Sequence, residues 1–194
     1  MKTFRTLVAA AILAGSAAYA ATITYQTNLT GPGESPPNAS AGTGFATVVI
    51  DTVANTMFVS VSFSGLSGTT TASHIHCCTA VPFTGTAGVA TQTPTFLNMP
   101  LGVTSGSFMQ TLDLTLASTY NPAFVTSQGS VANAETALLA GMAAGDTYLN
   151  IHTSVVPGGE IRGFLALATP EPATLLMAGV ALIGLGIRRR YSRG

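Results

Sequence analysis

The stretch TMFVSVSF, residues 56–63, decides the fold of this chain. Every second residue from Met57 to Phe63 is apolar, whereas Thr56, Ser60 and Ser62 on the other face are polar. Because successive side chains of a strand point to opposite faces, this alternation predicts a half-buried antiparallel strand. Residues 108–116 repeat the pattern, with apolar residues at Phe108, Leu112, Leu114 and Leu116.

The rest of the central region also favours strands. Further strands are predicted at residues 23–29, 45–51, 73–77, 148–153 and 160–167. Residues 132–144 instead carry apolar side chains at helical spacing, with Asn133 as the predicted N-cap and Gly145 as the stop. Residues 79–104 are rich in Gly, Pro and Thr and predict a long loop. We therefore expect a mainly β fold, a Greek-key antiparallel β-sandwich with one helical crossover.

The first 20 residues have the layout of a secretory signal peptide. Lys2 and Arg5 supply positive charge, residues 7–13 are apolar, and Ala20 ends an Ala-Tyr-Ala triplet of the kind that signal peptidase cleaves. The apolar run is too short for a membrane anchor. We expect cleavage by signal peptidase after Ala20, which leaves residues 21–167 as the exported β domain.

The C-terminal residues 168–194 form a three-part tail. Pro170, Glu171 and Pro172 precede an apolar run over residues 173–187, and residues 188–194 contain four arginines. As a helix, the run is about 22 Å long, shorter than the bilayer core of about 30 Å, so it spans only with local thinning or with snorkelling arginines. The arginines predict a cytoplasmic C-terminus. An unprocessed tail anchor has the same composition.

This tail resembles the PEP-CTERM sorting signal of Gram-negative bacteria, since all three parts occur in order at the extreme C-terminus. The resemblance implies that the chain passes through an inner-membrane intermediate and that the enzyme exosortase processes it near Pro170, Glu171 and Pro172. It further implies that the mature protein reaches the cell surface, the envelope or an exopolysaccharide matrix.

The charge of the exported domain limits its partners. Six of the seven basic residues lie in the two terminal segments, and Arg162 is the only Lys or Arg between them, against six acidic residues. Nucleic-acid binding requires clustered Lys and Arg, so no nucleic-acid partner is expected. As the single base of the domain, Arg162 is expected to pair with a carboxylate.

The domain has three histidines, and their spacing places two of them together. His74 and His76 share one face of a strand, and Ile75 takes the other. If Ile75, Ile151 and Ile161 all point into the core, the opposite faces carry a polar group of residues. Its members are His74, His76, Asn150, His152, Glu160 and Arg162.

These segments resemble the CHRD domain, a module found in exported bacterial proteins. The matching pieces are Gly33-Glu34 followed by Pro36, Gly65-Leu66, residues 72–76, residues 138–145, Tyr148–Thr153 and residues 159–163. They cover nearly all of residues 21–167 in the expected order. One departure is the pair Cys77-Cys78, which stands where family members often have a Gly-containing loop.

A metal site is one interpretation of the histidines. A His-x-His pair presents two imidazoles to one ion, and His152 is a candidate third ligand, with Glu160 as a fourth ligand or an orienting partner. Imidazole-rich sites favour copper or zinc. The alternative is that the histidines only hydrogen-bond backbone and hydroxyl groups and hold the sheet edges.

The adjacent Cys77 and Cys78 leave three alternatives open. In an oxidising, exported setting they form a vicinal disulfide, ligate the same metal as thiolates, or pair with another molecule.

Two functions follow from these patterns. The first is an exported, exosortase-processed protein without enzymatic activity, acting as a structural or binding component of the envelope or the exopolysaccharide matrix, with or without metal. No nucleophile elbow or phosphate-binding loop is present to indicate catalysis. The alternative is a small copper or zinc protein for storage, scavenging or redox chemistry, with its site at His74, His76 and His152. The two differ in whether the three histidines converge.

Overall fold

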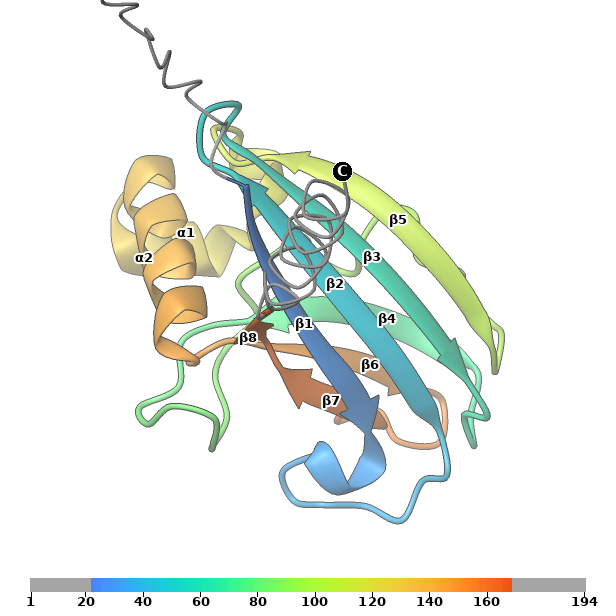
Figure 1. Ribbon diagram of the computed structural model, residues 1–194. Helices are drawn as coiled ribbons and strands as arrows, with labels where there is room; N and C mark the ends of the chain where they lie inside the picture. The colour runs from blue at the N-terminus through green and yellow to red at the C-terminus, as the bar shows by residue number, and fades with distance from the viewer. Residues whose placement is uncertain (1–21, 169–194) are drawn as a thin grey trace, which may run out of the picture.

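The computed structural model describes residues 22–168, in which an antiparallel sheet curls into a half-barrel (Figure 1). The strands in chain order are β1 (Thr22–Thr30), β2 (Thr43–Asp51), β3 (Thr56–Ser64), β4 (Thr70–His76), β5 (Gly106–Asp113), β6 (Tyr148–Thr153), β7 (Ile161–Phe164) and β8 (Ala166–Leu167). Their spatial order is β4-β6-β7-β1-β2-β3-β5, and β8 also pairs with β1. The predicted mainly β class is confirmed, and the arrangement is consistent with a β-sandwich.

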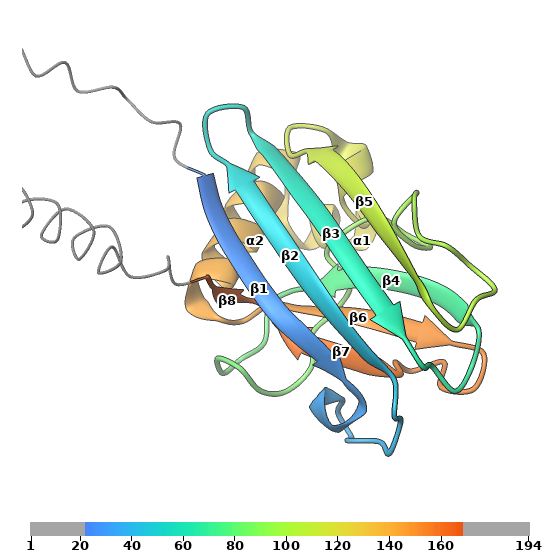
Figure 2. The same cartoon turned by 45° about the vertical axis from the view of Figure 1, so that its right-hand side comes forward.

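Two parts of the curled sheet face each other. Strands β1, β2, β3 and β5 run side by side in one part, and β4, β6 and β7 lie behind them (Figures 1 and 2). The chain just before β5 closes one end, because Thr70 N donates to Val103 O at 2.8 Å and Gly102 N donates to Thr70 O at 2.9 Å. The core between the two parts includes Ile75, Ile151 and Ile161, all fully buried as predicted.

The alternating stretch at residues 56–63 forms β3. Met57, Val59, Val61 and Phe63 are buried in the core, as their spacing predicts. Residues 108–116 form β5 over most of their length, but the pattern does not extend to Leu116, which is 51% exposed. The strand ends at Asp113, whose carboxylate accepts hydrogen bonds from Thr115 N and Oγ1 where the chain turns toward the short 3-10 helix η2 (Ala117–Thr119).

The helical crossover between β5 and β6 contains two α-helices, α1 (Pro122–Gln128) and α2 (Val131–Ala144). The second helix is the predicted one and ends at Gly145, with φ of 80°, but Ser130 rather than Asn133 caps it by accepting from Asn133 N. The first helix was not predicted, because seven residues are too few for a helical period to show. The sequence nevertheless indicates where this helix begins, because Asn121 caps it and Pro122 follows as its first residue.

The long loop predicted over residues 79–104 covers the free edge of β4. Cys77 N donates to Gly88 O at 3.0 Å, and Ala90 N donates to Ile75 O at 2.9 Å. Unpaired strand edges invite association with other chains, so this covering protects the sheet. It also brings loop carbonyls to the outer face of β4.

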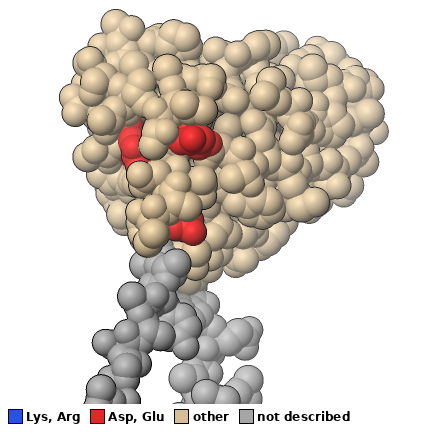
Figure 3. Space-filling model, turned by 90° about the horizontal axis from the view of Figure 1, so that it is seen from above, with Lys and Arg blue, Asp and Glu red and all other residues tan. Residues whose placement is uncertain are grey.

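Neither terminal segment falls among the described residues. The predicted signal peptide with Ala20, the triplet Pro170, Glu171 and Pro172, and the apolar run over residues 173–187 all lie outside them. Within residues 22–168, no helix has the length and apolar character needed to cross a membrane. Seen from above, the domain shows acidic side chains and no Lys or Arg on the face in view (Figure 3).

Candidate metal centre

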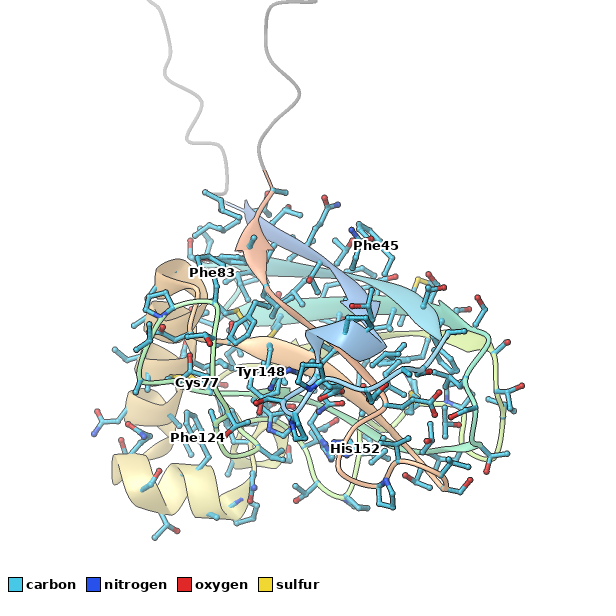
Figure 4. The ribbon with its side chains drawn as sticks, turned by 90° about the horizontal axis from the view of Figure 1, so that it is seen from below. Phe45, Cys77, Phe83, Phe124, Tyr148 and His152 are labelled. Atoms are coloured by element: carbon cyan, nitrogen blue, oxygen red, sulfur yellow. A yellow bond between two sulfur atoms is a disulfide. The ribbon has the colours of Figure 1, made fainter. Side chains whose placement is uncertain are left out.

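Two neighbouring strands carry the three histidines. His74 and His76 lie on β4 and His152 lies on β6, where the antiparallel register pairs Ala72 with His152. Ile75 points into the core, so the alternation of the strand turns His74 and His76 to the outer face. The strand geometry alone therefore places all three imidazoles on one side of the sheet. Figure 4 views this side of the molecule, with His152 and Tyr148 labelled.

The three rings converge on a common point. One ring nitrogen from each of His74, His76 and His152 lies within 4.8 Å of the others. The ring centroids are 5.2 Å apart for His74 and His152, 5.8 Å for His74 and His76, and 6.1 Å for His76 and His152. Imidazole nitrogens stand about 2.0–2.1 Å from a bound zinc ion, so a small inward movement of the rings would bring all three to one ion.

A backbone carbonyl fixes the orientation of each ring. His74 Nε2 donates to Pro94 O at 2.6 Å, His76 Nδ1 to Ala87 O at 2.9 Å, and His152 Nδ1 to Pro157 O at 2.8 Å. A carbonyl oxygen only accepts, so the bonded nitrogen of a neutral ring must carry the proton. The other nitrogen then presents a lone pair. This is the arrangement that orients metal-ligating histidines in proteins.

The remaining nitrogens are buried and have no hydrogen-bond partner. They are His74 Nδ1, His76 Nε2 and His152 Nε2. A buried polar atom without a partner costs about 1–3 kcal/mol, so three of them in one cluster of histidines require an explanation. Because the first nitrogen of each ring is held by a carbonyl, these three are the ones available to a shared ion.

Burial also sets the protonation of the two β4 histidines. Desolvation lowers the pKa of His76 to about 4, although its bond to Ala87 O acts in the opposite direction. Desolvation likewise lowers the pKa of His74. Both rings are therefore neutral at pH 7, which is the form that binds a metal ion.

The structure does not bring Glu160 to the histidines. Its side chain is fully buried elsewhere, where it accepts hydrogen bonds from Ser40 Oγ, Ser67 N and Thr153 Oγ1 at 2.6 Å each and from Gly68 N at 3.2 Å. Burial raises the pKa of Glu160, but these hydrogen bonds outweigh that effect and lower the pKa to about 2. Glu160 thus ties the 65–68 turn and residue 40 to the end of β6.

Cys77 and Cys78 do not offer thiolates to the cluster either. A disulfide joins their sulfurs, with the two Cα atoms 3.0 Å apart. The pair packs on α2 at Gly141, where a Cβ would stand 2.7 Å from each sulfur. Of the three alternatives open from the sequence, the structure has the vicinal disulfide.

A row of stacked side chains continues from the histidines across the sheet. The ring of His76 stacks on Tyr148, and the guanidinium carbon of Arg162 lies 4.6 Å from the centre of the Tyr148 ring. Arg162 Nε donates to Gly33 O at 2.6 Å and lies 3.7 Å from a carboxylate oxygen of Glu34. The predicted partnership of Arg162 with a carboxylate is confirmed.

Sequence reasoning missed three kinds of site residue. Backbone carbonyls of Ala87, Pro94 and Pro157 leave no trace in residue type, so nothing in the sequence marks them. The sequence signals Tyr148 only by its place on the same predicted strand as His152, and the observed register sets it opposite His76. The sequence does not indicate which of the six acidic residues pairs with Arg162, so it could not single out Glu34.

Comparison with known proteins gives two matches by family model. The model described as CHRD domain matches residues 25–165, and the model described as PEP-CTERM protein-sorting motif matches residues 168–190. The searches of curated proteins and of solved structures found no match. The sorting motif indicates processing by exosortase, export, and a cell-surface or extracellular location.

Proposed function

Because the chain belongs to the CHRD domain family, a non-catalytic family, and carries a PEP-CTERM sorting motif, we propose that it is an exported metal-binding protein. Its β domain would hold one copper or zinc ion through His74, His76 and His152. Its place would be the cell surface or an exopolysaccharide matrix, reached after cleavage by signal peptidase after Ala20 and passage through the inner membrane.

One observation carries the metal proposal. One nitrogen of each ring is buried without a partner, the other donates to a carbonyl, and the three histidines bring one ring nitrogen each within 4.8 Å of the others. Histidines with a purely structural role would use both nitrogens or expose the spare one to water. Here the spare nitrogens of His74 and His76 belong to side chains that are only 7% exposed.

The donor set supports copper or zinc over harder ions. Three neutral imidazoles suit these borderline metals, whereas calcium and magnesium prefer carboxylate and carbonyl oxygens. Glu160 is engaged elsewhere and the sulfurs form a disulfide, so the three imidazoles leave a coordination position for water or an outside ligand. We favour binding over redox catalysis because the CHRD domain family is non-catalytic.

The metal proposal is tested by measuring the number of metal ions bound per chain. The full chain is purified in mild detergent without chelator, loaded with copper or zinc, and measured by elemental analysis. The variants His74→Gln, His76→Asn and His152→Asn each keep an amide N–H at the position that donates to the carbonyl and remove the free nitrogen. The double variant Cys77→Ser, Cys78→Ser is the control for binding to sulfur.

We expect about one ion per chain in the natural protein and in the cysteine control, with binding at least about tenfold weaker in each histidine variant. A folded natural protein that stays free of metal after loading would overturn the proposal. The histidines would then hold the loops at the sheet face, and the domain would be a structural component of the surface or matrix.

A further inference from the structure

A cavity of about 500 Å³ lies beside the metal centre, beyond Tyr148 and Arg162. Its walls come from the end of β1, the turn η1 (Gly31–Gly33) and the residue after it, the loop around Phe83, and β7. The side chains that matter to the argument are Asn28, Glu34, Phe83, Thr84, Arg162 and Phe164. None of the three histidines lines the cavity, so the cavity is a separate site.

Phe83 stands at the cavity as a fixed, exposed aromatic ring. It is 57% exposed and has φ of 58°, a left-handed conformation that disfavours bulky residues. Its N–H donates to Gly145 O at 2.8 Å, and its ring packs over Gly145, where a Cβ would clash with it. Phe164 meets the same ring edge to face at 6.2 Å between centroids. Backbone strain that presents an apolar ring to solvent is typical of a functional site.

The other side of the cavity pairs a hydrogen-bond donor with an acceptor. Arg162 is the only Lys or Arg among residues 22–168, and Glu34 lies 3.7 Å from it. The residue Glu34 is 7% exposed, and its Oε1 has no hydrogen-bond partner. Glu34 and Arg162 are only 7% and 4% exposed, and burial raises the pKa of Glu34 to about 7 although Arg162 lowers it, so the pair presents no exposed charge to the cavity. The exposed polar lining, which includes Asn28 and Thr84, is uncharged and fits a neutral ligand that both donates and accepts hydrogen bonds.

We propose that this cavity binds a neutral sugar residue of a polysaccharide. The apolar face of a pyranose ring would lie on Phe83, and its hydroxyls would bond the exposed amide of Asn28 and the hydroxyl of Thr84. The volume is large enough for one or two sugar units and is typical of small-ligand pockets. The inference rests on the proposed placement at a cell surface or in an exopolysaccharide matrix, but it does not rest on the metal.

Saturation-transfer NMR of the full chain in a sugar-free detergent tests whether the cavity binds a neutral sugar. The neutral probes are cellobiose, maltose, lactose and mannobiose, and digalacturonic acid is the acidic probe. Phe83→Ala removes the ring, and Val81→Ala is the matched control, because Val81 is 56% exposed on the same loop and does not line the cavity. The variant His76→Asn reports on dependence on the metal centre.

We expect saturable signals from ring protons of at least one neutral disaccharide. The affinity should fall at least about tenfold in Phe83→Ala and stay unchanged in Val81→Ala and His76→Asn. Signals from no neutral probe, signals from digalacturonic acid alone, or equal binding by Phe83→Ala would each overturn the inference. Bound metal in the elemental analysis would then still stand, so the two proposals fail separately.

Discussion

The ring of His76 lies flat against the ring of Tyr148, with 4.6 Å between centroids and 8° between planes. Tyr148 also binds the loop that orients His76, since its hydroxyl donates to Ala87 O at 3.1 Å and accepts from Ala87 N at 3.2 Å. The same carbonyl accepts the proton of His76 Nδ1. Tyr148 therefore positions His76 twice, through its ring and through its hydroxyl.

The substitution Tyr148→Phe tests this positioning. It keeps the stacked ring and removes both hydrogen bonds to Ala87, so the carbonyl that fixes His76 should move more freely. We expect zinc affinity, measured by isothermal titration, to fall about tenfold, the range found for groups that orient metal ligands.

Tyr120→Phe is the matched control for that change. Tyr120 also donates a buried hydroxyl to a backbone carbonyl, Leu114 O at 2.8 Å, but it lies among the core residues near α1. It should lose about 1 kcal/mol of stability and none of its zinc affinity. Equal affinity in Tyr148→Phe and the natural protein would contradict the positioning role.

A metal ion that binds only the folded domain should raise its free energy of unfolding. Zinc at about 100 times its dissociation constant should raise the free energy of unfolding by about 2.7 kcal/mol. The rise follows from mass action on the folded state, which alone assembles the three histidines. Thermal unfolding followed by circular dichroism measures it, and in His152→Asn the same zinc concentration should produce almost no shift.

Glu160 should make the domain sensitive to acid. The folded state holds its pKa at about 2, below the usual 4.5, so its contribution to stability is complete above pH 4.5. That contribution is lost as the pH falls from 4.5 through 2, because the unfolded chain then binds a proton that the folded state does not take up until about pH 2. Urea unfolding between pH 7 and pH 2 measures the loss.

Glu160→Gln should remove much of this acid dependence and cost about 2 kcal/mol at pH 7, since the buried donors of Ser40 and Thr153 lose an ionised acceptor. Glu135→Gln on α2 is the control and should keep the acid dependence of the natural protein. An unchanged acid profile in Glu160→Gln would show that other carboxylates are responsible.

Gly141 should resist substitution although it lies inside α2. Alanine usually stabilises a helix relative to glycine by about 1 kcal/mol, but a Cβ here would stand 2.7 Å from the sulfurs of Cys77 and Cys78. Gly141→Ala should therefore lower stability by about 1–3 kcal/mol. Gly158→Ala, where a Cβ meets nothing within 4 Å, should be close to neutral in the same thermal unfolding experiment.

The period-two pattern was enough to predict the strands and the placement of the histidines. Ile75 and Ile151 point into the core, and this forces His74, His76 and His152 to the outer face together. The side-chain direction of Glu160 was not predictable in this way. Strand β7 begins only at Ile161, so the alternation of the strand does not determine where the side chain of the preceding residue points. Three of the four groups that donate to it, Ser40 Oγ and the N–H groups of Ser67 and Gly68, lie in links between strands.

The loop contributions were also beyond sequence reasoning. Pro94 and Ala87 reach the histidines because the 79–104 segment pairs with the edge of β4, and such pairing has no residue signature. Leu116 continues an apolar alternation past the end of β5, where the hydrogen bonds of Asp113 turn the chain away from the core. Local contacts of this kind override the pattern at the ends of elements.

X-ray absorption spectroscopy of the zinc-loaded chain tests the central claim most directly, because it reports the atoms bound to the ion. The proposed site predicts three imidazole nitrogens at about 2.0 Å, a light atom in the remaining position and no sulfur. A sulfur shell at about 2.3 Å, or a spectrum left unchanged by His76→Asn, would contradict it.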